Sequence, residues 1–162
     1  MHKHLCVLIS GLLSFTSMTA ACADNKADSS VESAALRCSA ISLMHSTLTT
    51  PSPQFGEVMG EIAGLYAQVY AVQQEARSKQ KLNNAELRKR RDAVLSEISK
   101  GWPKNKTTIV RDAAICNAWR IDFFSKLPEK PTEKEFHTAL ASLGPPPATG
   151  AKSEIDKWNG LT

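Results

Sequence analysis

The sequence has few of the residues and motifs on which most enzyme chemistry depends. It contains four histidines and four cysteines, but no HExxH, GxSxG or CxxC motif and no glycine loop that could cradle a phosphate. Two of the histidines, His45 and His137, lie beyond residue 23. His45 follows Cys38 by two helical turns, about 10.5 Å, which is too far for the two side chains to share a metal ion. We therefore predict no catalytic residue, no metal site and no cofactor.

No apolar run in the sequence is long enough to cross a membrane. The longest spans residues 5–15, directly after the short basic start 1–4, whereas a transmembrane helix needs about 20 apolar residues. A short apolar run followed by small residues is typical of a secretory signal peptide. We predict that residues 1–23 are a signal peptide that is cleaved, and that the protein is exported.

Two processing routes fit the end of this segment. The small-x-small pattern Ala21–Ala23 suits an ordinary signal peptidase, which would release residues 24–162 into the periplasm. Alternatively, Ala20–Cys22 resembles the end of a bacterial lipobox, although Thr19 stands where the lipobox usually has leucine. In that case Cys22 would be lipidated and would anchor the protein to the envelope.

Aromatic residues make up only 6% of the chain, and no alternating β-branched run is long enough for a strand. Alanine, leucine, lysine and glutamate, which favour helices, are abundant. The sequence therefore predicts an all-α fold, a small up-down helical bundle of four to five helices over residues 24–144. A Pro- and Gly-rich polar tail should follow over residues 145–162.

Cysteine usage predicts one disulfide. Cys38 and Cys116 are the two cysteines that lie beyond Cys22, and an even pair without CxxC spacing in an exported protein indicates a structural bond. Its loop of 78 residues gives a stabilisation of about 4.5 kcal/mol by the chain-entropy estimate. The bond would join the first helix to the fourth.

Five helices are expected from capping signals and apolar spacing. Start signals are Ser29-x-x-Glu32, Ser52 before Pro53, Asn83-x-x-Glu86 and Thr132-x-x-Glu135. The short second loop predicts that the second and third helices are antiparallel neighbours. The expected ranges are 31–48, 53–82, 85–101, 108–127 and 132–143.

The second expected helix carries the most regular apolar pattern. Its apolar residues recur at steps of three and four, a repeat of 3.5 residues that is typical of a bundle seam. We therefore expect this seam to face the core. Its members are Phe55, Val58, Ile62, Leu65, Val69, Val72 and Ala76.

Gly56, Gly60 and Gly64 form a row on the same helix, and each glycine costs about 0.5–1 kcal/mol relative to alanine. Glycines spaced by four let another backbone approach closely. The row would serve as a helix-packing site within this chain, as a groove for a partner's helix, or as a membrane-active zipper. The adjacent Glu57 and Glu61 disfavour a lipid environment, and this pair could itself form a carboxylate site.

Residues 77–106 hold ten basic and three acidic residues, a local charge of +7, whereas residues 24–162 together carry +3. Such a stretch is either a solvated face or a site for an anionic partner, which would be another protein or an anionic envelope surface. Nucleic acid is disfavoured because no aromatic residues interleave the basic ones. The candidate binding residues are Arg88, Lys89, Arg90, Arg91, Lys100 and Trp102.

Three functions compete on this evidence. The leading interpretation is an exported, non-enzymatic protein of the bacterial envelope, which acts as a protein-binding module of the inhibitor or immunity type. The alternative is a membrane-associated or membrane-active helical protein that uses the glycine row and the basic stretch, with lipidation as a further route to the membrane. The third is an enzyme with a carboxylate site at Glu57 and Glu61.

Overall fold

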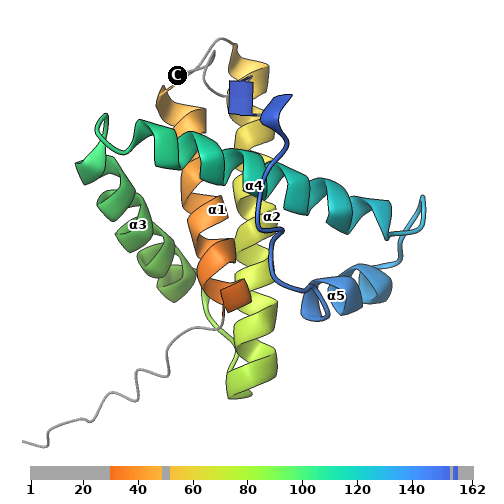
Figure 1. Ribbon diagram of the computed structural model, residues 1–162. Coiled ribbons are helices and arrows are strands. Elements are labelled where there is room, and N and C mark those ends of the chain that lie inside the picture. Colours follow the sequence, from red (N-terminus) through yellow and green to blue (C-terminus); the bar gives the residue numbers. More distant parts are fainter. Residues whose placement is uncertain (1–29, 49–51, 154, 157–162) are drawn as a thin grey trace, which may run out of the picture.

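The computed structural model describes residues 30–48, 52–153 and 155–156, so the predicted signal peptide and Cys22 lie outside the described residues. This part of the chain contains five helices and no strand (Figure 1). The predicted all-α bundle is therefore confirmed. The helices are α1 (Ser30–Leu48), α2 (Pro53–Ser78), α3 (Asn84–Gly101), α4 (Lys106–Ser125) and α5 (Glu133–Ala141).

Helix α1 lies at the centre of the bundle. Helix α2 packs along it, α4 lies across both helices, and α5 sits beside α2 (Figure 1). Helix α3 packs mainly on α1, and less on α2, which the short loop predicted as its neighbour. A short loop places the ends of two helices together, but the apolar faces decide which helices pack. Because α1 is buried on most of its circumference, it can receive α2, α3 and α4 together.

The capping signals predicted at Ser52, Asn83 and Thr132 are confirmed. The Ser52 hydroxyl accepts the Phe55 N–H at 3.2 Å, and the Asn83 side chain accepts the Glu86 N–H at 2.8 Å. Thr132 begins α5 with a capping box. Helix α2 ends at Ser78, four residues earlier than expected, because the backbone turns left-handed at Lys79 with a φ of 59°.

The expected seam of α2 is not the centre of its buried face. Val58 is 50% exposed and Ala76 is exposed, whereas Val69 is 1% exposed. Tyr66 and Tyr70, which the apolar count left out, are fully buried because their hydroxyls have partners. The Tyr66 hydroxyl donates to the Cys116 carbonyl, and the Arg90 guanidinium donates to the Tyr70 hydroxyl at 2.5 Å. The core face is therefore rotated towards Met59, Ala63, Tyr66, Ala67 and Tyr70.

The predicted disulfide is confirmed and lies in the core. Cys38 on α1 and Cys116 on α4 are bonded at an S–S distance of 1.96 Å, and both are buried. Trp119 belongs to the same cluster and stacks on Tyr66 at 5.7 Å between ring centroids. Its indole N–H donates to the carbonyl of Gly144 at 3.1 Å, which holds the chain after α5 against this cluster.

A buried ion pair joins the start of α1 to the end of α2. An Arg77 guanidinium nitrogen lies 2.9 Å from a Glu32 carboxylate oxygen, and the Glu32 side chain is only 1% exposed. The sequence pattern suggested Glu32 as a capping partner of Ser29, which lies outside the described residues. Within the described residues, the Glu32 carboxylate compensates a cation from another helix.

The first part of the expected tail runs back over α4 (Figure 1). A Cβ added at Gly150 would lie 2.6 Å from the backbone carbon of Ala114, so the two backbones are in close contact. Ile155 packs against a second core cluster, which includes Ile41, Met59 and Ile109. The sequence did not predict the contact between Gly150 and Ala114, because glycine makes it through its backbone and has no apolar side chain to indicate it.

Removal of the disulfide should cost much of the stability. We expect Cys38→Ala/Cys116→Ala to lower the free energy of unfolding by about 4 kcal/mol, because the unfolded chain regains the entropy of an open loop. Urea unfolding followed by circular dichroism measures this change. The unmutated protein in reducing agent should show the same loss, and a loss below about 1 kcal/mol for the variant would contradict the expectation.

Removal of one member of the buried ion pair should also be costly. We expect Arg77→Ala to destabilise the fold by about 3 kcal/mol, since it leaves the Glu32 carboxylate buried without its cation. The control is Lys79→Ala, two residues away, which removes an exposed cation. Equal midpoints for the two variants in urea unfolding would show that the pair contributes nothing.

Candidate functional site

Helix α3 carries most of the predicted basic stretch and lies on the outside of the bundle (Figure 1). Ile98 is its buried residue, and Leu87, Val94 and Leu95 are half-buried against the two core clusters. The side chains on the opposite side of the helix face solvent. The apolar stripe therefore attaches α3 to the bundle, and the polar side stays accessible.

Three of the ten basic residues in the stretch form ion pairs within the chain. Besides Arg77, Arg90 lies 2.9 Å from Glu86, and Arg91 lies 3.0 Å from Asp92. Arg90 also donates to Tyr70, and its guanidinium carbon lies 5.9 Å from the Tyr70 ring centre. Its hydrogen bonds to Glu86 and Tyr70 raise the pKa of Arg90. The bond between Arg90 and Glu86 also lowers the pKa of Glu86. Arg90, a candidate binding residue, thus holds α3 to α2.

The other seven basic residues of the stretch have no ion-pair partner among the residues that the structure describes. Six are exposed, and Lys106 is half-buried. Charge that is unmatched within the chain is available to a partner. These residues are Lys79, Lys81, Arg88, Lys89, Lys100, Lys104 and Lys106.

Lys89 and Lys100 lie on the same line of α3. They are eleven residues apart, which corresponds to three turns and a rise of about 16 Å. Ala93 and Ser96 lie between them on this line, and all four side chains are exposed. We call these four residues the α3 ridge. The side chains between its two cations are small, so an extended anionic surface of a partner could contact both lysines.

Trp102 sits where α3 ends and is half-buried. It packs against the second core cluster, so its ring covers the end of the bundle. Its role is therefore at least partly structural, and the basic residues carry more of the accessible surface than this aromatic ring does.

The glycine row does not provide close packing at Gly60 or at Gly64. A Cβ added at Gly60 or Gly64 would meet no atom within 4 Å. Glu57 and Glu61, beside the row, are exposed and have no ion-pair partner in the described part of the chain. No helix among the described residues is long and apolar enough to cross a membrane.

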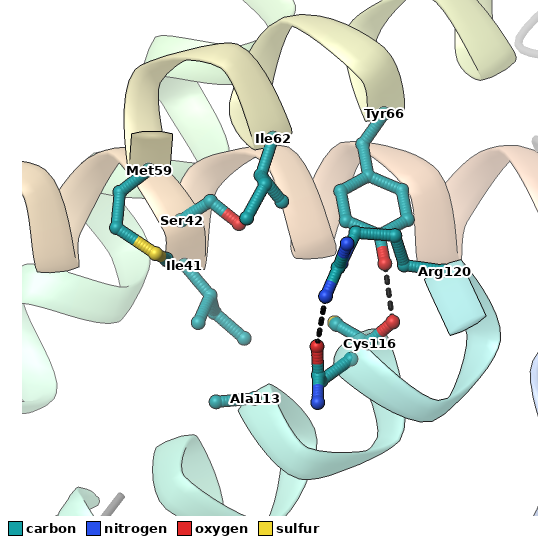
Figure 2. Close-up of a pocket in the computed structure, with 9 residues that line it drawn as sticks. Ile41, Ser42, Met59, Ile62, Tyr66, Ala113, Cys116 and Arg120 are labelled. Carbon is teal, nitrogen blue, oxygen red and sulfur yellow. Dashed lines mark hydrogen bonds between the residues drawn. The ribbon is translucent and has the colours of Figure 1, made fainter. Parts of the chain in front are cut away.

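A small cavity lies beside the disulfide (Figure 2). Its volume is about 20 Å³, which is room for about one water molecule. Ser42, Tyr66, Asn117 and Arg120 contribute polar side chains, and the Arg120 guanidinium donates to Asn117 at 2.9 Å. Burial raises the pKa of the Tyr66 hydroxyl. The cavity is too small for an organic substrate.

The two histidines are in different environments. His45 on α1 is 2% exposed, and burial lowers its pKa to about 4. His137 on α5 is exposed and lines a groove of about 430 Å³ between α5, α2 and the start of α3. Sequence reasoning missed this groove because its walls come from separate helices. The described residues contain no group of three potential metal ligands.

Comparison of the chain with known protein families, curated proteins and solved structures found no match. The function is therefore inferred from the arrangement of the chain's own residues.

The buried histidine should make stability depend on pH. Because the folded pKa of about 4 lies below the unfolded value of 6.5, its contribution is complete above pH 6.5 and is lost as the pH falls towards 4. We expect this contribution to approach about 3 kcal/mol. Urea unfolding between pH 7 and 4 measures it.

His45→Leu should flatten this part of the pH profile, and His137→Gln, at an exposed position, should leave it unchanged. An identical profile in the His45 variant would show that other groups cause the acid sensitivity.

Proposed function

We propose that the protein is an exported, non-enzymatic binding module of the bacterial envelope, of the inhibitor or immunity type. Its binding surface is the α3 ridge with the neighbouring basic residues, and its partner is an acidic protein. The observation that carries this proposal is the set of seven basic residues that have no ion-pair partner within the described chain.

The charges suit recognition better than stabilisation. An exposed ion pair contributes about 0–1 kcal/mol to folding, and these residues form none within the described chain. A cluster of one sign raises the local potential and accelerates encounter with an oppositely charged partner. The ridge therefore favours fast, salt-sensitive binding.

The scaffold holds this surface in place before binding. Arg90 connects α3 to Tyr70 of α2, and Ile98 anchors it in the second core cluster. The disulfide connects α1, on which α3 packs, to α4. A surface ordered in the unbound protein loses less conformational entropy on binding.

The alternative is binding to anionic lipid through the same residues, which contributes about 1 kcal/mol for each lysine or arginine near the surface. Lipidation of Cys22 would strengthen it. The glycine row adds little support, since Gly60 and Gly64 are flanked by exposed Glu57 and Glu61. Acid–base catalytic sites usually hold their carboxylates in a cleft. Glu57 and Glu61 are exposed, so an enzyme with a carboxylate site there is the least favoured of the three functions.

Photo-crosslinking tests the proposal directly. A photoreactive residue at Ser96, between the two lysines of the ridge, should capture an acidic protein in the envelope of the source cell. Arg88→Glu/Lys89→Glu/Lys100→Glu should reduce this capture at least tenfold, because it changes the sign of the surface.

The control is Lys130→Glu/Lys134→Glu/Lys152→Glu, which makes the same change of charge at exposed positions outside α3. It should retain capture. Equal capture by both variants would contradict a role for the ridge. Salt-sensitive binding of purified protein to anionic vesicles, with no crosslinked protein, would favour the lipid alternative instead.

A further inference from the structure

The groove beside α5 has an apolar floor and a charged rim. It lies between α5, the C-terminal half of α2 and the start of α3, and its volume is about 430 Å³. Pockets for small molecules typically measure about 300–1,000 Å³ and combine apolar walls with a few polar groups. The floor consists of Val72, Leu82, Leu87, Phe136 and Leu140.

This floor is part of the core. Leu140 is buried in the disulfide cluster, and the other four floor residues are half-buried against it. The apolar surface is therefore supported from below by the cluster that contains the disulfide. A ligand that covers it would remove further apolar area from water, which favours binding.

Helix α5, which forms one wall, is held at both ends. The Gln73 side-chain amide on α2 donates to the carbonyls of Leu140 and Ala141, both at 2.9 Å, and so caps the last turn. Phe136 meets Phe123 of α4 edge to face at 5.6 Å between ring centroids. The Thr132 capping box fixes the first turn. The groove is therefore formed without a ligand.

Four ionisable residues line the groove, namely Glu75, Lys81, Glu133 and His137. None of them forms an ion pair with another described residue, and all four are exposed. The two carboxylates outnumber the one lysine, so the rim carries a formal charge of −1 with histidine counted as neutral. A cation complements this rim better than an anion does.

We propose that the groove binds a small amphipathic cation, a molecule with one apolar alkyl or aryl body and one ammonium group. The apolar body covers Leu87, Phe136 and the rest of the floor, and the ammonium lies between Glu75 and Glu133. A small molecule fits the volume, whereas a helix or an extended peptide needs a longer groove. The site is separate from the α3 ridge, shares only Lys81 with the seven basic residues that are unpaired in the described chain, and does not depend on the proposed function.

Three probes with the same body separate the contributions. We expect 4-phenylbutylamine to shift the amide NMR signals of Leu82, Leu87, Phe136 and His137 in a saturable way. The uncharged 4-phenylbutanol should bind about fivefold more weakly, and 4-phenylbutyrate should be weaker still, because the apolar contacts are shared and the charge differs.

Matched variants locate the charge effect. Glu75→Gln/Glu133→Gln should lower amine affinity about fivefold and leave the affinity for the alcohol unchanged. Glu57→Gln/Glu61→Gln makes the same substitutions in the other half of α2 and should bind like the unmutated protein. Ala71→Phe, which fills the groove, should abolish binding, and its NMR spectrum shows whether the fold is kept.

Equal affinity for amine and butyrate would overturn the proposal, and so would shifts spread evenly over the surface. Tighter binding of an apolar peptide with a lysine than of the amine would show that the groove is a docking site for another chain. The crosslinking at Ser96 tests the α3 ridge, and these titrations test the groove. A negative result in one experiment therefore leaves the other proposal unaffected.

Discussion

The Cys38–Cys116 bond fixes α4 across α1, and much of the remaining architecture depends on this crossing. Tyr66 donates to the carbonyl of Cys116 and stacks on Trp119, so α2 meets α4 at the same point. The chain after α5 returns to this point through the hydrogen bond from Trp119 to Gly144. Elements far apart in the sequence thus converge on one covalent contact.

Two groups of charged residues have different roles. One group joins helices, as Glu32 with Arg77 and Arg37 with Asp112 do, the latter at 2.7 Å between α1 and α4. The other group lies on the outer side of α3, in its flanking loops and at the start of α4, without ion-pair partners in the described chain. A local charge of +7 counted along the sequence does not separate these groups, because Glu32, the partner of Arg77, comes from another helix.

The fold places two kinds of surface near one another. The α3 ridge is polar, cationic and convex, as expected of the outer side of a helix, whereas the groove is apolar at its floor and acidic at its rim. A helical bundle produces both from the same elements, since Leu87, on the inward side of α3, lines the groove, and residues on the outward side form the ridge. Leu87 and Lys89 illustrate this division two residues apart.

Local chemistry in the sequence determined the helix type, the caps at Ser52, Asn83 and Thr132, and the cysteine pair, because each depends on a few neighbouring residues or on a simple count. Tertiary structure decided which faces are buried. The seam expected on α2 gave way to Tyr66 and Tyr70, whose hydroxyls are satisfied by Cys116 and Arg90 from other helices. Tertiary structure also decided the role of Arg90, which bonds Tyr70 of another helix, and the position of the groove, whose walls come from separate helices. In each case the contacting residues are close in space and far apart along the chain.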